Sequence, residues 1–178
     1  MGAPVADSAE RYCLFDTAFG LCGIAWSARG LTRVQLPEAD AAATRARLKT
    51  GGATEGEPPP ALAWVLAAFG AYFDGAETDF SSLTVALPAD TSGERRRIYD
   101  TARQLRWGET ASYGEVAKRA GLPRGAQAVG QAMAANPLPI IIPCHRVLAA
   151  GDRLGGFSAY GGVLTKEKLL VLERARLL

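Results

Sequence analysis

The sequence has 178 residues, of which 48% are hydrophobic and 21% charged, so it can bury a core and has an ordinary globular composition. Its longest apolar stretches, at residues 61–69 and 140–142, are far shorter than the roughly 20 residues that cross a bilayer. No basic and apolar leader opens the chain. We therefore expect a soluble, cytoplasmic protein without a membrane partner, and we expect its three cysteines to be free thiols.

Charge divides the chain into an acidic and a basic half. Residues 1–90 carry 6 Lys and Arg against 11 Asp and Glu, whereas residues 91–178 carry 14 against 7. A basic half suits a polyanion such as nucleic acid, because neutralised phosphates release counterions. A solvated basic surface would give the same counts, so charge alone leaves both interpretations open.

The chain begins with short runs that predict a β-meander. Residues 11–19, 22–27 and 31–36 alternate in part between apolar and polar side chains, and glycines separate them. Cys13 and Cys22 fall in these runs. A zinc site needs four ligands and this half has no histidine, so we expect both cysteines to pack in the core and expect no metal.

Helices are predicted after the meander. Residues 38–49 and 61–73 have helical patterns, and a loop rich in Gly, Glu and Pro separates them. Residues 81–87 fit either a further strand or the start of a linker. The natural boundary follows at once, which gives a small N-terminal α/β domain at 1–88 and a mainly helical C-terminal domain at 89–178.

The C-terminal half predicts a helix-turn-helix. After a helix at about 94–106, a short helix lies within residues 112–120, Gly121 ends it, and another helix spans about 124–135. Two short helices joined by a turn that contains glycine are typical of helix-turn-helix units. Such pairs also occur as plain packing units, so the spacing alone does not establish nucleic-acid binding.

The second of these helices has a face of mainly small residues. At helical spacing, one face carries Ala126, Val129, Gly130 and Met133, and the opposite face carries Arg124, Gln127, Ala128, Gln131 and Ala135. A helix that reads bases in the major groove would present several Arg, Asn or Gln side chains. This helix instead permits close backbone approach, with Gln127 as its most prominent projection.

A proline-rich stretch at residues 136–148 carries a cysteine beside the sole histidine of the sequence. Its three prolines fix the backbone φ, so we expect the Cys144 thiol at the end of a stiff, buried segment. A free thiol is mostly protonated near neutral pH, and His145 and Arg146 could supply the base and the positive environment that a nucleophile needs. Adjacent side chains rarely face each other, so His145 is expected to act through a bridging water. A buried cysteine beside a surface histidine is the structural alternative.

Four stretches together resemble the active-site signature of the O6-alkylguanine-DNA alkyltransferases, or methylated-DNA–protein-cysteine methyltransferases. They are GETASYGE at 108–115, QAVGQAM at 127–133, NPLPIIIPCHRV at 136–147, and the run from Tyr160 to Glu173, so that the resemblance covers about residues 92–175. It implies a C-terminal helix-turn-helix domain of winged-helix-like type. The first half is similar to the family only in layout, as a ribonuclease-H-like α/β domain.

The resemblance implies DNA repair by direct transfer. Members of the family bind duplex DNA in the minor groove, largely independently of sequence, and flip the damaged nucleotide out of the stack. The alkyl group of O6-alkylguanine, and of O4-alkylthymine, moves to the cysteine, and the protein is consumed after one turnover. No cofactor is required, and we expect a monomer in solution.

The resemblance also assigns roles at the reacting centre. Cys144 would be the alkyl acceptor, and His145 the base that takes its proton through a water. Glu173 would hold and polarise that histidine, as a buried carboxylate orients imidazole in other nucleophile systems. Tyr113 would press on the phosphate beside the flipped nucleotide and offer its hydroxyl to the base.

Other positions are implied to bind the base or the DNA. Asn136 would brace the turn before the cysteine segment, the carbonyls of Cys144 and Val147 would accept from the guanine amino group, and Ser158 and Tyr160 belong to the loop that closes the pocket. The DNA contacts are expected at Tyr113, Gly114, Arg124, Gln127, Ala128, Gln131 and Ala150.

The chain departs from the family at Gln127, where an arginine usually fills the gap left by the extruded base. Glutamine is shorter and uncharged, so we predict weaker or slower flipping. Three other functions compete with transfer. They are a damage-sensing DNA-binding protein with weak or no transfer activity, a sequence-specific regulator that uses the helix-turn-helix, and a cysteine hydrolase.

Overall fold

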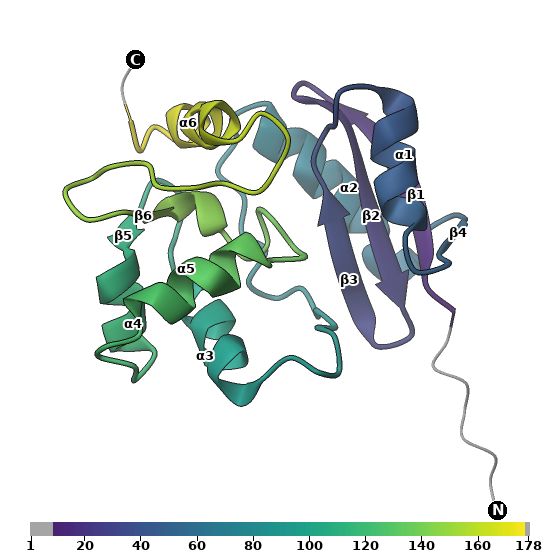
Figure 1. The fold of residues 1–178 in the computed structure, drawn as a ribbon. Coiled ribbons are helices and arrows are strands. Elements are labelled where there is room, and N and C mark those ends of the chain that lie inside the picture. The colour runs from purple at the N-terminus through teal and green to yellow at the C-terminus, as the bar shows by residue number, and fades with distance from the viewer. Residues whose placement is uncertain (1–8, 177–178) are drawn as a thin grey trace, which may run out of the picture. The chain divides into compact units, whose positions relative to one another are not determined.

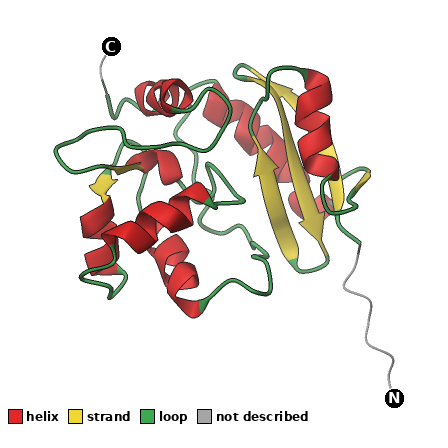
Figure 2. Ribbon diagram, viewed as in Figure 1, coloured by secondary structure: helices red, strands yellow, loops and turns green. Residues whose placement is uncertain are grey.

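The computed structural model describes residues 9–176, which fold into two compact units of helices and short strands (Figures 1 and 2). The first unit contains residues 9–76 and Ser82–Pro88, and the second contains Glu77–Ser81 and residues 89–176. The domain boundary expected after residue 88 differs from this division by Glu77–Ser81. Arg103 of the second unit donates to two carbonyls within that segment, at 3.3 Å each.

The first unit is built on a four-stranded sheet in the order β3-β2-β1-β4. β1 (Arg11–Thr17), β2 (Gly20–Ser27) and β3 (Gly30–Gln35) are antiparallel neighbours, which confirms the predicted meander. β4 (Thr54–Glu55) pairs parallel to β1 within a stretch that was predicted to be loop. Val85 forms an isolated parallel bridge to Leu31 of β3, whereas Ser81 and Ser82 lie in a turn, so only part of the ambiguous stretch at 81–87 pairs with the sheet.

Two helices cover opposite faces of this sheet. α1 (Ala41–Lys49) places Leu48 against Tyr12 and Ala25. α2 (Pro60–Phe73) packs Phe69 against Phe15 from the other side, with ring centroids 5.6 Å apart and the rings tilted by 40°. Successive strand residues point to opposite faces, so the central strand β2 is buried on both sides and reads as a nearly continuous apolar run.

The two cysteines of the sheet are shielded thiols of low reactivity. Cys22 is buried and Cys13 half-buried, and burial raises the pKa of each thiol to about 11. A protonated, shielded thiol is a poor nucleophile and a poor metal ligand. The expectation that both would pack within the fold is confirmed.

The second unit consists mainly of helices. Its elements are α3 (Gly93–Ala102), β5 (Ala111–Ser112), α4 (Tyr113–Arg119), α5 (Ala126–Ala134), the 3-10 turn η1 (Cys144–Arg146), β6 (Val147–Leu148) and α6 (Val163–Leu172). α3 ends four residues earlier than its apolar pattern predicted. Leu105 donates its N–H to Ala102 three residues back, which is a turn and not a continued α-helix.

Local sequence signals fix both ends of α4. Ser112 accepts the Glu115 N–H and Glu115 accepts the Ser112 N–H, which together make a capping box. At the other end Gly121 adopts φ +75°, and Leu122 donates to the Ala117 carbonyl at 2.8 Å, as in a Schellman termination. Tyr113 is thereby the first residue of the helix.

α5 follows α4 and buries a slightly different face from the predicted one. Val129 and Met133 are buried as expected, but Ala132 is buried and Ala126 exposed. A helix of 3.6 residues per turn places position 132 about 60° from position 129, on the side away from position 133, so the buried face is rotated toward Ala132 relative to the predicted stripe. Gln127 and Gln131 are exposed, as predicted.

A two-residue parallel ladder joins the start of α4 to the segment after the cysteine. Ala111 pairs with Val147 and Ser112 with Leu148. This ladder was not predicted. It places Tyr113 next to the chain that carries Cys144, although the two residues are 31 positions apart in the sequence.

Candidate active site

The segment before Cys144 is buried and closed by its own side chains. Asn136 accepts the Leu138 N–H at 2.9 Å and donates from Nδ2 to the Ile142 carbonyl at 2.8 Å, so its amide bridges the two ends of the turn. Ile140 has φ +73°, a left-handed conformation that costs a β-branched residue about 1–3 kcal/mol. Ile140 and the apolar residues around it are buried, so the expected burial of this segment is confirmed.

The 3-10 turn η1 separates side chains that are adjacent in sequence. With three residues per turn, successive side chains point about 120° apart. Cys144 accordingly lines a cavity of about 210 Å³, with Tyr113, Gly130, Met133, Ala134, Gly156, Phe157 and Ser158 as the other lining residues. His145 and Arg146 instead reach Glu173. This three-residue turn thus places one side chain at the cavity and the other two in a buried cluster of ionisable groups.

Glu173 connects the histidine and the arginine. It follows the last residue of α6 and is 1% exposed. Its Oε1 lies 2.7 Å from His145 Nε2, and Arg146 donates to both carboxylate oxygens at 2.8 Å. Burial opposes ionisation of this carboxyl, but His145 and Arg146 outweigh it and lower the pKa of Glu173.

This geometry fixes the histidine tautomer. An ionised carboxylate only accepts, so Nε2 carries the hydrogen, and in the neutral ring Nδ1 carries the lone pair. Burial lowers the pKa of His145, although Glu173 acts in the opposite direction, so the ring is neutral at physiological pH. Burial also raises the pKa of the Cys144 thiol, while Asn136 and Lys166 partly oppose that shift. The resting pair is a neutral thiol beside a neutral base.

Lys166 is a site residue that the sequence reasoning missed. It is 1% exposed, and its Nζ donates to the carbonyls of Val147 at 2.7 Å and Gly156 at 3.2 Å. The same nitrogen lies 5.9 Å from the centroid of the Tyr113 ring. Burial lowers the pKa of Lys166 to about 8, and Cys144 acts against that shift.

Of the predicted substrate residues, Ser158 lines the cavity together with Cys144 and Tyr113. Val147 is buried, and its carbonyl accepts a hydrogen bond from Lys166. Tyr160 is 56% exposed and is not among the cavity's lining residues. Sequence reasoning also missed the apolar walls, which Met133, Ala134 and Phe157 supply.

The predicted DNA contacts lie mostly on the surface. Gly114, Arg124, Gln127, Gln131 and Ala150 are exposed, whereas Tyr113 and Ala128 are half-buried. All of them belong to the second unit, which is also the unit that contains Cys144.

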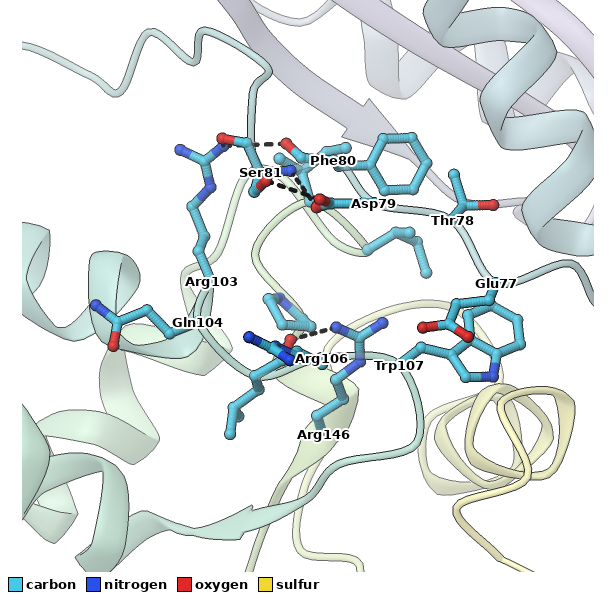
Figure 3. Close-up of a pocket in the computed structure, with 14 residues that line it drawn as sticks. Glu77, Thr78, Asp79, Phe80, Ser81, Arg103, Gln104, Arg106, Trp107 and Arg146 are labelled. Atoms are coloured by element: carbon cyan, nitrogen blue, oxygen red, sulfur yellow. Dashed lines mark hydrogen bonds between the residues drawn. The ribbon is translucent and has the colours of Figure 1, made fainter.

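The Cys144 segment also borders a larger cavity of about 740 Å³ within the second unit (Figure 3). Figure 3 shows Arg146 reaching this cavity, where its Nη1 donates to the Leu105 carbonyl at 2.6 Å. The remaining lining residues include Glu77, Asp79, Arg103, Arg106 and Trp107. Arg146 therefore binds both the Glu173 carboxylate and the backbone at Leu105, which follows α3.

Within residues 9–176, none of the helices is long and apolar enough to cross a membrane. No group of three or more His, Cys, Asp or Glu side chains there could hold a metal ion.

Fold and site together define an α/β protein of two units, whose second unit joins the short helices α4 and α5 by a turn and contains a buried cysteine, a neutral histidine and a carboxylate. A family profile described as "6-O-methylguanine DNA methyltransferase, DNA binding domain" matches residues 94–175. The methylated-DNA–protein-cysteine methyltransferase of Mycolicibacterium paratuberculosis is 42% identical over 118 residues, which are 66% of this chain and 68% of that protein.

Two further comparisons extend over nearly the whole chain. The methylated-DNA–protein-cysteine methyltransferase of Mus musculus is 33% identical over 171 residues, covering 92% of this chain and 81% of its own. A crystal structure of Mycobacterium tuberculosis OGT in complex with DNA superposes with a TM-score of 0.75 and 31% identity over 93% of both chains. The chain belongs to the methylated-DNA–protein-cysteine methyltransferase family.

Proposed function

We propose that this protein repairs alkylated DNA by moving the alkyl group of O6-alkylguanine, and of O4-alkylthymine, to Cys144. The observation that carries the proposal is the placement of the Cys144 thiol in a cavity, while the adjacent histidine is kept neutral by burial and is oriented by a buried carboxylate. Such a histidine can accept the proton that the thiol must lose before it becomes a good nucleophile.

In the reaction the sulfur attacks the alkyl carbon, and the bond between that carbon and the guanine oxygen breaks. The electron pair of this bond stays with the guanine, which takes a proton from the Tyr113 hydroxyl. The thiol proton passes through a water to His145 Nδ1. The imidazolium then returns a proton through water to the Tyr113 phenolate, so both side chains end neutral. The product is a thioether at Cys144, and a thioether has no proton to lose and no good leaving group. Each molecule therefore acts once.

The transfer requires the base to leave the duplex. We propose that α5 enters the minor groove, where its small exposed side chains permit close approach, and that Gln127 fills the gap of the flipped nucleotide. Tyr113, Gly114, Arg124, Ala128, Gln131 and Ala150 complete the contact surface. Affinity then depends on the basic half of the chain and little on sequence.

The proposal assigns the two units different tasks. The second, of winged-helix-like type, binds DNA and accepts the alkyl group, and the first is a ribonuclease-H-like α/β domain. The division after residue 88 is the functional boundary, and the protein acts as a monomer in the cytoplasm. Asn136, Val147, Ser158 and Tyr160 bind the extruded base.

A lesion sensor without transfer activity would share the DNA-binding surface. The buried ion cluster behind Cys144 favours transfer, because a sensor needs no base for a thiol. Intact-protein and peptide mass spectrometry after mixing with an O6-methylguanine duplex separates the two functions, with Cys144→Ala as the control. A methyl group on the Cys144 peptide supports transfer, whereas binding of the lesion by unmodified protein supports the sensor.

A further inference from the structure

Five ionisable side chains gather in the interior around Cys144. They are Cys144, His145, Arg146, Lys166 and Glu173, and none is more than 7% exposed. With the thiol and the imidazole neutral, two cations face one anion. Burying an uncompensated charge is costly, so an excess cation in a protein interior needs a physical reason.

Arg146 and Lys166 differ in how their charges are satisfied. Arg146 pairs with Glu173 through two hydrogen bonds of 2.8 Å, so these two charges compensate each other. The Nζ of Lys166 donates to two backbone carbonyls, which carry no net charge. The cluster therefore holds one positive charge more than it needs at rest.

Arg146 affects whether the His145 imidazole is protonated. If Glu173 faced only the imidazole, the buried carboxylate would favour a protonated ring, and a protonated ring cannot accept a proton. Because Arg146 already compensates Glu173, a proton on His145 would add a further uncompensated charge beside Lys166. Burial contributes most to the lowered pKa of His145, and Arg146 and Lys166 add to it, so the ring rests as the neutral base.

Lys166 affects how readily the Cys144 thiol loses its proton. When the thiol loses its proton, the thiolate compensates the lysine, and the favourable interaction between them lowers the cost of ionisation. Tyr99 and Tyr113 also face Cys144, but burial raises the pKa of both phenols, so they stay uncharged at neutral pH.

Lys166 also fixes the wall of the cavity. It binds the Gly156 carbonyl, and the Gly156 backbone in turn hydrogen-bonds to Tyr113. Its second acceptor, the Val147 carbonyl, belongs to the chain that follows Cys144. One ammonium group thus ties the pocket loop, the cysteine segment and the first residue of α4 together.

We propose that Arg146 and Lys166 are positioning residues that set the proton distribution of the site before DNA binds. Arg146 keeps Glu173 ionised and helps to keep His145 neutral. Lys166 carries a buried positive charge, which the Cys144 thiolate compensates once it forms. The inference rests on the proposed role of Cys144 as alkyl acceptor, but its test requires no DNA.

The first measurement uses the unmodified protein. The chain has one histidine and four lysines, so each relevant side chain gives a resolvable NMR signal after selective isotope labelling. We expect the imidazole to stay neutral with its hydrogen on Nε2 down to well below pH 6.5. One lysine should titrate near pH 8, well below the other three. An imidazole that protonates near pH 6.5, or four lysines that titrate alike, would overturn the proposal.

The second measurement follows the rate at which iodoacetamide alkylates Cys144, read on the Cys144 peptide as a function of pH. Lys166→Gln keeps a donor but removes the charge, and the pH–rate profile should move to higher pH, with about tenfold slower reaction for each unit of pKa change. Lys166→Arg keeps the charge and should stay near the wild-type profile. The exposed Lys168, two residues along α6, provides the matched control Lys168→Gln.

Arg146→Gln tests the other half, because Glu173 then faces the imidazole without its cationic partner. The NMR signal of His145 should show protonation at higher pH than in the wild type, and Arg146→Lys should restore part of the difference. Identical profiles for Lys166→Gln and Lys168→Gln, or an unchanged His145 titration in Arg146→Gln, would contradict the proposal. Failure of methyl transfer from DNA with these profiles intact would instead refute the proposed function alone.

Discussion

Glu173 accepts hydrogen bonds from two residues that are adjacent in sequence, His145 and Arg146. The carboxylate therefore has two roles: it fixes the imidazole tautomer, and it compensates a buried guanidinium. Substitutions of Glu173 should affect both chemistry and stability, whereas substitutions of His145 should affect mainly chemistry. The difference between them separates proton transfer from the support of the fold.

His145→Ala should slow methyl transfer by about 100-fold or more, which is the usual contribution of a general base. Binding to an undamaged duplex should change little, since the imidazole is fully buried and cannot touch DNA. Glu173→Gln should slow transfer as well and also destabilise the protein by about 3–5 kcal/mol, because Arg146 loses its ion-pair partner. Single-turnover rates and DNA binding are measured in parallel, and equal losses in both would discredit the assigned roles.

Gln127→Arg should accelerate repair in duplex DNA. The longer, charged side chain fills the gap of the extruded base better and adds one phosphate-attracting charge, at an exposed position of α5 where it meets no steric conflict. Transfer from the same lesion in a single strand should be unaffected, because no base has to leave a stack. Equal rates for variant and wild type on the duplex would remove Gln127 from the flipping step.

Sequence reasoning recognised Cys144 and His145 from their neighbours in one continuous stretch. Tyr113 and Glu173, which lie elsewhere in the chain, were implied only by the family resemblance. Lys166 was missed, although a signal existed. Lys166, Leu169, Leu170 and Glu173 recur at helical spacing i, i+3, i+4 and i+7, so two charged residues lie on the buried face of α6.

At the scale of elements, α4 depends on its capping box and on the β5–β6 ladder. Both act within three residues of Tyr113, so they determine where its ring stands over Lys166 and beside the cavity. Ser112 takes part in both, as the N-cap of the helix and as the last residue of the ladder.

Ser112→Ala should lower the free energy of unfolding by about 1 kcal/mol through loss of the cap, which corresponds to a decrease of roughly 2–4 °C in Tm. It should also slow methyl transfer, because Tyr113 loses its fixed position. Ser81→Ala, at an exposed turn and not among the residues that line the cavity of Cys144, serves as a comparison in the same unit. Unchanged stability together with unchanged transfer would show that the cap does not position Tyr113.

The longer elements were predictable and the shortest were not. The meander, both helices of the first unit and the helix-turn-helix follow from periodicity and turn residues, which are local properties. β4 and the β5–β6 pair have two residues per strand and exist only through pairing with distant chain. A two-residue segment contains no sequence signal that identifies the strand with which it pairs.

At the scale of the whole molecule, the buried histidine should make stability depend on pH. The folded-state pKa of His145 is lowered below its unfolded value of about 6.5, so the unfolded chain binds the proton first as the pH falls. The part of the free energy of unfolding that depends on a neutral His145 is therefore present above that pH and is lost below it. The loss approaches about 1.4 kcal/mol per pH unit. The lowered pKa of Glu173 adds a further loss below about pH 4.3.

Urea unfolding between pH 7.5 and 5.5 measures the first of these effects. The wild type should lose stability across this range, and His145→Gln, which has no titrating group there, should lose less. The sequence contains no other histidine, so the difference between the two curves reports this side chain alone. Parallel curves would mean that His145 is not held neutral in the folded protein.

The central claim is that Cys144 accepts one alkyl group and does not release it. The direct measurement counts methyl groups transferred from an isotopically labelled O6-methylguanine duplex, supplied in excess over protein, until the reaction stops. The account predicts a plateau at one methyl per protein molecule, all of it on the Cys144 peptide, and a second addition of duplex should yield no more. Continued turnover, or a plateau reached without label on Cys144, would contradict it.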